Sequence, residues 1–588
     1  MSMSSNESDT VLTLRERIAA NPRPALIWVA GLALLILLEL GRIVGWILAA
    51  GGAVRLVLGA VPSVPWWVAD NVADGLSSVS GGLGQIGGAV GFSVTAALVL
   101  IAAAFLVKPL FVPFSVSKKI GLDARRVGPD ALSENLLERL VIAAGLGVGA
   151  ALVLVTPLGG ALEAAVASLT NALEWVANGW TLSDRELISN EGHRSPDGGW
   201  EGTFLGLSPA VAWAIRVLVI YAYAFAALVW LWKGYTTYRE HYRGADWTPR
   251  DDWINRFRTH YWGIFGLIVV FGFVVLALWA PALGAANAEA NLYSPYQNEF
   301  EYLTDDGEVE SIAHGTANIQ SRSQGGDSTV GIMSYDDYDR WAPLGTNPDG
   351  KDLFTFLAFG ARTSLMIGLI GIGIATSIAL MMSLITAYYK GTIDIATIVV
   401  SDTIISVPVF LMVLLLSVVF QQGNHPLADI YSGGLLLALI FGALYWPGLW
   451  RAIRGPSLQV AEQEWVDAAK SYGQTPMKTM RKHMAPYILS YIMIYASLLL
   501  GGVIITTAAL SFLGLGINPP TPEWGRMVSD GRSYVSTSSW HIATVPGILI
   551  VLVVTGFNAL GDGIRDAMDP ESESGDAGTT AAATGGGG

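Results

Sequence analysis

Long uncharged runs of apolar residues alternate with polar segments along most of this 588-residue chain. A run of roughly 20 apolar residues can cross a bilayer as a helix, and runs of that length are typical of membrane spans. The sequence therefore predicts an all-α, polytopic membrane helical bundle with about ten transmembrane helices. The predicted spans are residues 26–48, 93–112, 140–161, 210–232, 262–283, 363–388, 403–421, 433–451, 488–510 and 542–562.

One polar and basic segment, residues 465–486, lies between two long runs that contain no Asp, Glu, Lys or Arg. Gly473 is expected to take the left-handed conformation that ends a first helix. Thr475 is expected to cap a second helix that begins at Pro476, and Pro486 is expected to stop that helix at the membrane. The segment is therefore predicted to form a helical hairpin outside the bilayer, called the polar hairpin below.

The distribution of Lys and Arg between the loops predicts the orientation. Segments 108–139, 233–260 and 451–486 hold six basic residues each, whereas segment 49–92 holds one and segment 421–432 holds none. Cytoplasmic loops carry the excess of Lys and Arg. The polar hairpin and both termini are therefore predicted to be cytoplasmic.

Composition supports the membrane assignment and adds a hypothesis about the source. Hydrophobic residues make up 52% of the chain and charged residues 14%, against about 25% charged residues in typical soluble domains. The net charge is −14, only nine of the 34 basic residues are Lys, and Cys is absent. Acidic, Lys-poor and Arg-rich loops suit a cell that lives in high salt. Without Cys, disulfides and thiolate metal sites are excluded.

Both ends of the chain lead to expectations about processing and order. The first 21 residues are polar and precede an apolar run too long for the core of a signal peptide. The first span is therefore expected to remain as an anchor. Residues 571–588 are of low complexity and are expected to form a disordered tail.

No group of residues in the sequence has the spacing of an enzyme site. The seven His are scattered without the spacing of a metal site, and no basic patch with interleaved aromatics predicts nucleic-acid binding. Residues 345–351 have the GxxxxGK spacing of a phosphate-binding loop, but Asp352 follows where Ser or Thr belongs. We therefore expect no catalytic, cofactor-binding or metal-binding residues, and no ATP hydrolysis by this chain alone.

Four motifs follow one another in the second half of the chain. The first motif lies before the span at 363–388, and the second lies within the polar hairpin. The third lies in a predicted outer loop, and the fourth lies at the carboxy-terminal end. Their residues are Leu344-Gly345-Thr346 with Gly350, Asp352, Gly360-Ala361-Arg362 and Ser364-Leu365; Asp467-Ala468-Ala469 with Gly473, His483 and Pro486; Ser511-Phe512-Leu513-Gly514-Leu515-Gly516 with Pro519-Pro520-Thr521-Pro522 and Trp524-Gly525; and Asn558, Gly561-Asp562-Gly563, Arg565-Asp566 and Asp569-Pro570.

The second motif resembles the Glu-Ala-Ala loop of ABC importer permeases. The four together resemble the dipeptide/oligopeptide (and nickel) permease family, specifically its C-type subunit, over about residues 250–570. The chain departs from the family pattern at four positions. Asp467 replaces the usual Glu, Asn347 the usual Asp, Lys351 the usual Arg, and Ala485 the usual Leu.

The resemblance implies a six-helix permease core at 250–570, preceded by an extension at 1–249 with about four spans. It implies a plasma-membrane subunit that imports dipeptides or oligopeptides, driven by separate ATPases. The implied partners are a second homologous permease subunit, two ATP-binding subunits, an extracellular substrate-binding protein, membrane lipid and the peptide substrate. The residues implied to form the coupling loop to the ATPase are Asp467, Ala468, Ala469, Gly473, Thr475, Pro476, His483 and Pro486.

Several alternatives stay open on the sequence. In one alternative, an importer of the same architecture transports nickel or another small polar solute. In a second, the protein is a secondary transporter that works without ATP. In a third alternative, the protein is a membrane enzyme or a structural scaffold. The extension at 1–249 is either a docking or lipid-sealing module or a lineage-specific addition. The acidic outer loop at 284–352 is either a docking surface for a binding protein or an ordinary solvated loop.

Overall fold

The structure is a computed structural model, and the residues it describes are 13–60 and 158–568, except 246, 327–328 and 424, with isolated residues between 66 and 145. The predicted span 93–112, most of the span 140–161 and the predicted tail 571–588 lie outside the described residues.

Helices dominate the described part of the chain, which confirms the predicted all-α, multi-pass membrane fold. Six helices there are long and apolar enough to cross a membrane, and eight spans result if each of two bent helix pairs counts as one. The bounds of the long helices are α9 (Pro209–His241), α11 (Tyr261–Leu278), α14 (Leu353–Tyr389), α18 (Gly434–Ala461), α21 (Ala485–Phe512) and α23 (His541–Met568).

Two predicted spans have wrong boundaries. The first, 26–48, is divided at Glu39: α1 (Leu14–Ala20) and α2 (Pro22–Leu38) precede it, bent by 98°, and α3 (Leu40–Ala60) follows. The span predicted at 403–421 is two helices, α15 (Gly391–Ser406) and α16 (Val409–Gln422), bent by 78°. Pro408 lies at this bend, where a proline cannot donate a backbone hydrogen bond and restricts the residue before it.

The chain divides into two compact units. The larger consists of residues 1–38, 182–419 and 431–588, and the smaller of residues 39–181 and 420–430. In the smaller unit, α3 packs on α8 (Leu158–Ala177). α17 (Pro426–Asp429) belongs to the same unit. The predicted domain boundary at residue 249 stays a prediction.

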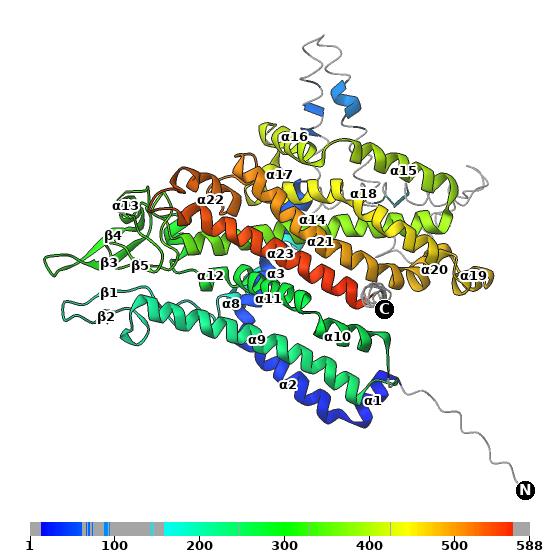
Figure 1. The fold of residues 1–588 in the computed structure, drawn as a ribbon, viewed down its shortest axis with the longest axis horizontal. Helices are drawn as coiled ribbons and strands as arrows, with labels where there is room; N and C mark the ends of the chain where they lie inside the picture. Colours follow the sequence, from blue (N-terminus) through cyan, green and yellow to red (C-terminus); the bar gives the residue numbers. More distant parts are fainter. Residues whose placement is uncertain are drawn as a thin grey trace, which may run out of the picture. The chain divides into compact units, whose positions relative to one another are not determined.

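In the larger unit, α14 packs on α18, α18 on α21, and α21 on α23, while α11 packs along α23 (Figure 1). Glycines allow the closest approaches. A Cβ atom at Gly266 of α11 would lie 2.4 Å from the backbone nitrogen of Leu560, and one at Gly563 would lie 2.6 Å from the Cα of Gly263. Small residues that let helix backbones approach are typical of helix packing in membranes.

Among the helices before residue 249 in this unit, α2 packs against α9. The indole nitrogen of Trp28 donates to the carbonyl of Trp230 at 3.1 Å, and that of Trp230 donates to the carbonyl of Trp28 at 3.0 Å. Glycine faces each ring, because Gly31 lies against Trp230 and Gly234 against Trp28.

The acidic segment at 284–352 is folded where the structure describes it. β3 (Glu299–Leu303) and β4 (Val309–Ala313) form an antiparallel hairpin, followed by α13 (His314–Gln320). A second antiparallel pair joins β5 (Ser334–Tyr335) to β6 (Trp341–Ala342). The other short elements of this unit are β1 (His193–Arg194), β2 (Trp200–Glu201), α10 (Pro249–Thr259), α12 (Ala280–Leu283), α19 (Glu464–Ser471), α20 (Pro476–Thr479) and α22 (Trp524–Gly531).

Candidate functional site

The first arm of the polar hairpin is α19, and its end has the geometry that the sequence predicted. Gly473 adopts a φ of +73°. Its backbone nitrogen donates to the carbonyl of Lys470 at 2.9 Å, and that of Gln474 donates to the carbonyl of Ala469 at 3.1 Å. These two bonds form a Schellman motif, which satisfies the last carbonyls of a helix with a left-handed glycine.

The second arm begins as predicted but does not end as predicted. Thr475 has the extended backbone of an N-cap residue and Pro476 takes the first turn of α20, although the Thr475 side chain makes no capping hydrogen bond. Pro486 does not stop the helix: a π-helical turn, Met480–Met484, leads without a break into α21, and Pro486 lies in its first turn. Proline is tolerated in a first turn, and a π-turn rearranges the preceding hydrogen bonds.

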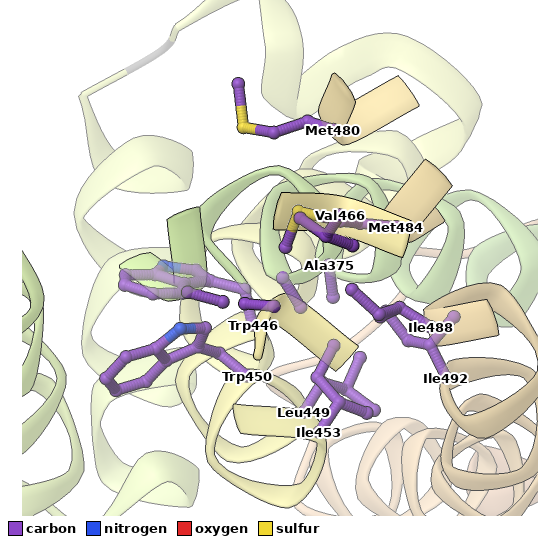
Figure 2. Packing of buried hydrophobic residues seen from close by; sticks show 13 residues of the cluster. Ala375, Trp446, Leu449, Trp450, Ile453, Val466, Met480, Met484, Ile488 and Ile492 are labelled. Carbon is purple, nitrogen blue, oxygen red and sulfur yellow. The ribbon is translucent and has the colours of Figure 1, made fainter. Parts of the chain in front are cut away.

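The base of the hairpin packs tightly against the ends of membrane helices. Val466, Met480 and Met484 belong to an apolar cluster with residues of α14, α18 and α21 (Figure 2). That cluster contains Trp446, Leu449, Trp450, Ile453, Ile488 and Ile492. Burying a Val or Met side chain contributes about 2 kcal/mol, so these contacts anchor the base of the hairpin to the helix bundle.

The predicted coupling residues divide between an exposed face and this packed base. Asp467, Ala468, Gly473, Thr475 and Pro486 are exposed, whereas Pro476 and His483 are half-buried. Ala469 is buried, at 6% exposure, so its small side chain serves packing inside the hairpin.

Large side chains that the sequence analysis did not single out complete the exposed face. Tyr472 is 89% exposed and Met477 59% exposed. Apolar side chains that form a contiguous exposed patch are typical of a protein–protein contact. Their position beside a turn glycine, between two helix ends, is the signal that could have found them.

Polar contacts hold the two arms together and tie the hairpin to the end of α14. The Nε2 of His483 lies 3.2 Å from the Oε1 of Gln474. Lys390, which follows α14, donates to Glu462 at 3.0 Å. Lys470 lies 5.4 Å above the ring of Tyr388. The exposed pair Lys470–Asp467, at 3.0 Å, adds little, because such surface pairs contribute about 0–1 kcal/mol.

Two ion pairs join α15 to α18 near the hairpin, and sequence reasoning missed them. The Nε of Arg454 donates to Asp394 at 2.9 Å and its Nη2 forms a second bond to the same carboxylate. Arg451 pairs with Asp402 and donates from its Nε to Ser401 at 3.2 Å. The spacing of eight residues between the two aspartates, and that of three between the arginines, puts each set on one helix face.

The motifs before α14 and before α22 meet on the other side of the bundle. Asp352 caps α14 by accepting from the backbone nitrogen of Thr355 at 2.7 Å, and burial raises the pKa of its carboxyl to about 6. Trp524 donates to the carbonyl of Leu357 at 2.7 Å. His541 contacts the carbonyl of Thr346 at 3.2 Å. These contacts fix the ends of the helices.

The GxxxxGK segment is a turn within the same region. The side-chain oxygen of Asn347 accepts from the backbone nitrogens of Asp349 and Lys351 at 3.0 and 2.9 Å. Lys351 donates to the carbonyl of Leu292 at 3.0 Å. Among the residues that the structure describes, no three His, Cys, Asp or Glu lie together in a way that could hold a metal ion.

Known proteins share this core. Residues 375–573 match the family described as binding-protein-dependent transport system inner membrane component. The dipeptide transport system permease protein of Alkalihalophilus pseudofirmus is 30% identical over 311 residues, which is 53% of this chain and 86% of that protein. The chain belongs to this family of importer permeases.

Two further relatives support the family membership. The oligopeptide transport system permease protein of Haemophilus influenzae is 34% identical over 228 residues, 39% of this chain and 70% of that permease. The glutathione transport system permease protein of Pectobacterium atrosepticum is 32% identical over 257 residues, 41% of this chain and 81% of that permease. This permease is therefore a multi-pass membrane protein with a transport role, in a family that works with binding proteins and ATPases.

Proposed function

We propose that this chain is the permease subunit of an ATP-driven importer for dipeptides or oligopeptides, and that the polar hairpin couples it to a separate ATPase. The relatives named above carry peptide or glutathione transport in their names, which supports a peptide substrate. The observation that carries the coupling role is an exposed face, with Ala468, Tyr472 and Met477, on a base buried against α18 and α21.

In the proposed mechanism, a binding protein delivers the peptide outside, and two homologous permease subunits enclose the path. Two ATPase subunits bind ATP and close. Their closure displaces the polar hairpin, and the hairpin carries α18 and α21 with it because the apolar cluster joins them. The free energy for the change comes from ATP binding at the partner, since a ligand shifts an equilibrium only by its difference in affinity for the two states.

Two adjacent alanines provide a matched test. Ala468→Leu enlarges an exposed residue of the proposed contact face, and Ala469→Leu enlarges a buried one. We expect Ala468→Leu to lower peptide uptake and peptide-stimulated ATPase activity at least tenfold, with unchanged thermal stability. Ala469→Leu should lower stability by about 1–3 kcal/mol, because overpacking strains a core.

Uptake and ATPase rates are measured on the complex reconstituted in vesicles, and unfolding is followed for both variants. Normal coupling in a stably inserted Ala468→Leu protein would contradict the role of the hairpin. Uptake of nickel or another solute in place of peptide would replace the substrate and keep the mechanism. Uphill uptake by the purified chain without an ATPase would favour a secondary transporter.

The orientation is tested by cysteine labelling, for which the absence of Cys makes the chain well suited. We expect a Tyr472→Cys protein in intact cells to resist a membrane-impermeant maleimide and to react once the membrane is opened. An Asp306→Cys protein, with its cysteine in the turn between β3 and β4, should react in intact cells. The reverse pattern would place the hairpin outside and exclude contact with a cytoplasmic ATPase.

A further inference from the structure

A cavity of about 890 Å³ lies beside the base of the polar hairpin, within the larger unit. Its walls come from the end of α9, the start of α10, the first turns of α21 and the end of α23, with Pro456 of α18. Ligand pockets in proteins measure roughly 300–1,000 Å³. Neither the coupling mechanism nor the relatives' names assign a role to this cavity.

The lining of the cavity has a basic part and an aromatic part. Arg243, Arg250 and Arg565 come from the loop before α10, from α10 itself and from the last turn of α23. Tyrosines come from the membrane-spanning helices α9 and α21, and Ile494 of α21 adds an apolar side chain. The tyrosines are Tyr235, Tyr238, Tyr487, Tyr491 and Tyr495.

Two of these arginines are available to a ligand. Arg243 is engaged with Asp251 at 2.7 Å. In the part of the chain that the structure describes, neither Arg250 nor Arg565 forms an ion pair with a carboxylate, and both side chains are exposed. A guanidinium presents several donors that match a phosphate group.

We infer that this cavity binds the headgroup of an anionic phospholipid, with the phosphate at Arg250 and Arg565 and the glycerol and upper acyl chains along the tyrosines. A free phosphate needs no aromatic wall, whereas a lipid has both a charged and an apolar part. Tyrosine is enriched where membrane and water meet, and basic pockets between spans on the cytoplasmic side bind anionic headgroups. The bound lipid would join the extension, through α9, to Pro486 and Tyr487 at the root of the polar hairpin.

The test measures lipid retention and does not depend on transport. The full chain, purified with its partner subunits from vesicles of phosphatidylcholine and phosphatidylglycerol with identical acyl chains, is analysed by native mass spectrometry. We expect phosphatidylglycerol to be retained preferentially and the double variant Arg250→Gln/Arg565→Gln to lose it roughly tenfold or more. Arg258→Gln is the matched control, because Arg258 is exposed on the same helix α10 and does not line the cavity.

A second variant tests the same inference in case the double arginine variant misfolds. Ser490→Trp fills the cavity from α21 while keeping all its arginines, and it should reduce retention to the same extent. Equal retention of the two lipids, equal loss in the Arg258→Gln control, or full displacement by inorganic phosphate would each overturn the inference. Displacement by phosphate would indicate a free-anion site.

Discussion

Ala468 and Ala469 are chemically identical neighbours with different surroundings, since the first is exposed and the second is buried. Because a helix turns by about 100° per residue, adjacent positions lie on different faces. The resemblance assigned both to the coupling loop, and only the folded hairpin separates the surface residue from the buried one. At Gly473, by contrast, the positive φ followed directly from residue type and position.

The stability of the region outside the spans depends on pH through His314. Burial, together with the positive charge of Arg340, lowers the pKa of its imidazole from 6.5 to about 4. Between these values the unfolded state binds a proton that the folded state does not. Stability is therefore complete above pH 6.5 and falls as the pH drops toward 4, by up to about 3 kcal/mol for this shift.

We expect hydrogen exchange at the amides of β4 and α13, corrected for the intrinsic rate, to lose protection between pH 7 and pH 4. A His314→Gln protein should lose less over the same range. Asp352 acts in the opposite direction, because burial raises its pKa to about 6, so the difference between wild type and variant isolates His314. Identical pH profiles would contradict the assignment.

At the scale of elements, two charge pairs join α15 to α18 in addition to apolar contacts. The side chains of Arg454 and Asp394 are 33% and 14% exposed, whereas those of Arg451 and Asp402 are 45% and 54% exposed. A bidentate, partly buried pair is stronger than an exposed one. The first pair is therefore expected to be the stronger of the two charged connections between α18 and α15.

A double-mutant cycle measures this connection. Asp394→Asn and Arg454→Gln should each reduce stability, and the pair should show a coupling energy of about 1–3 kcal/mol. The cycle of Asp402→Asn with Arg451→Gln is the matched comparison and should give less than about 1 kcal/mol. Thermal unfolding and peptide-stimulated ATPase activity are measured on all variants. Additive effects in the first cycle would show that the two residues act separately.

At the scale of the whole molecule, residues before 250 contribute directly to the unit that contains the transport core. The guanidinium of Arg216, on α9 and 1% exposed, donates to the carbonyls of Ile188 and Gly284, both at 2.9 Å, and to the side chain of Asn190 at 2.7 Å. Arg185 donates to the same Gly284 carbonyl at 2.7 Å. The extension is thereby joined to the segment that follows α12.

Removing this guanidinium should destabilise the whole unit. We expect Arg216→Met to lower the free energy of unfolding by about 3 kcal/mol, because buried acceptors lose charged donors. Arg239→Met, near the end of the same helix, is the control and should have an effect below about 1 kcal/mol. Thermal unfolding of the full chain in detergent checks both. Equal unfolding temperatures would mean that the extension and the core are energetically independent.

The sequence by itself determined the membrane class, most spans in the described part, the turn at Gly473 and the family, because uncharged length, residue type and motif order are local properties of the chain. It failed at Pro486, where a π-turn that no local pattern predicts lets the helix continue into α21. Tertiary structure alone decided that Ala469 is buried while Ala468 is exposed, that Asp394 and Arg454 are partners, and that arginines and tyrosines from four helices line one cavity. Each of these depends on which faces of distant helices meet, and that choice is made by packing over the whole chain.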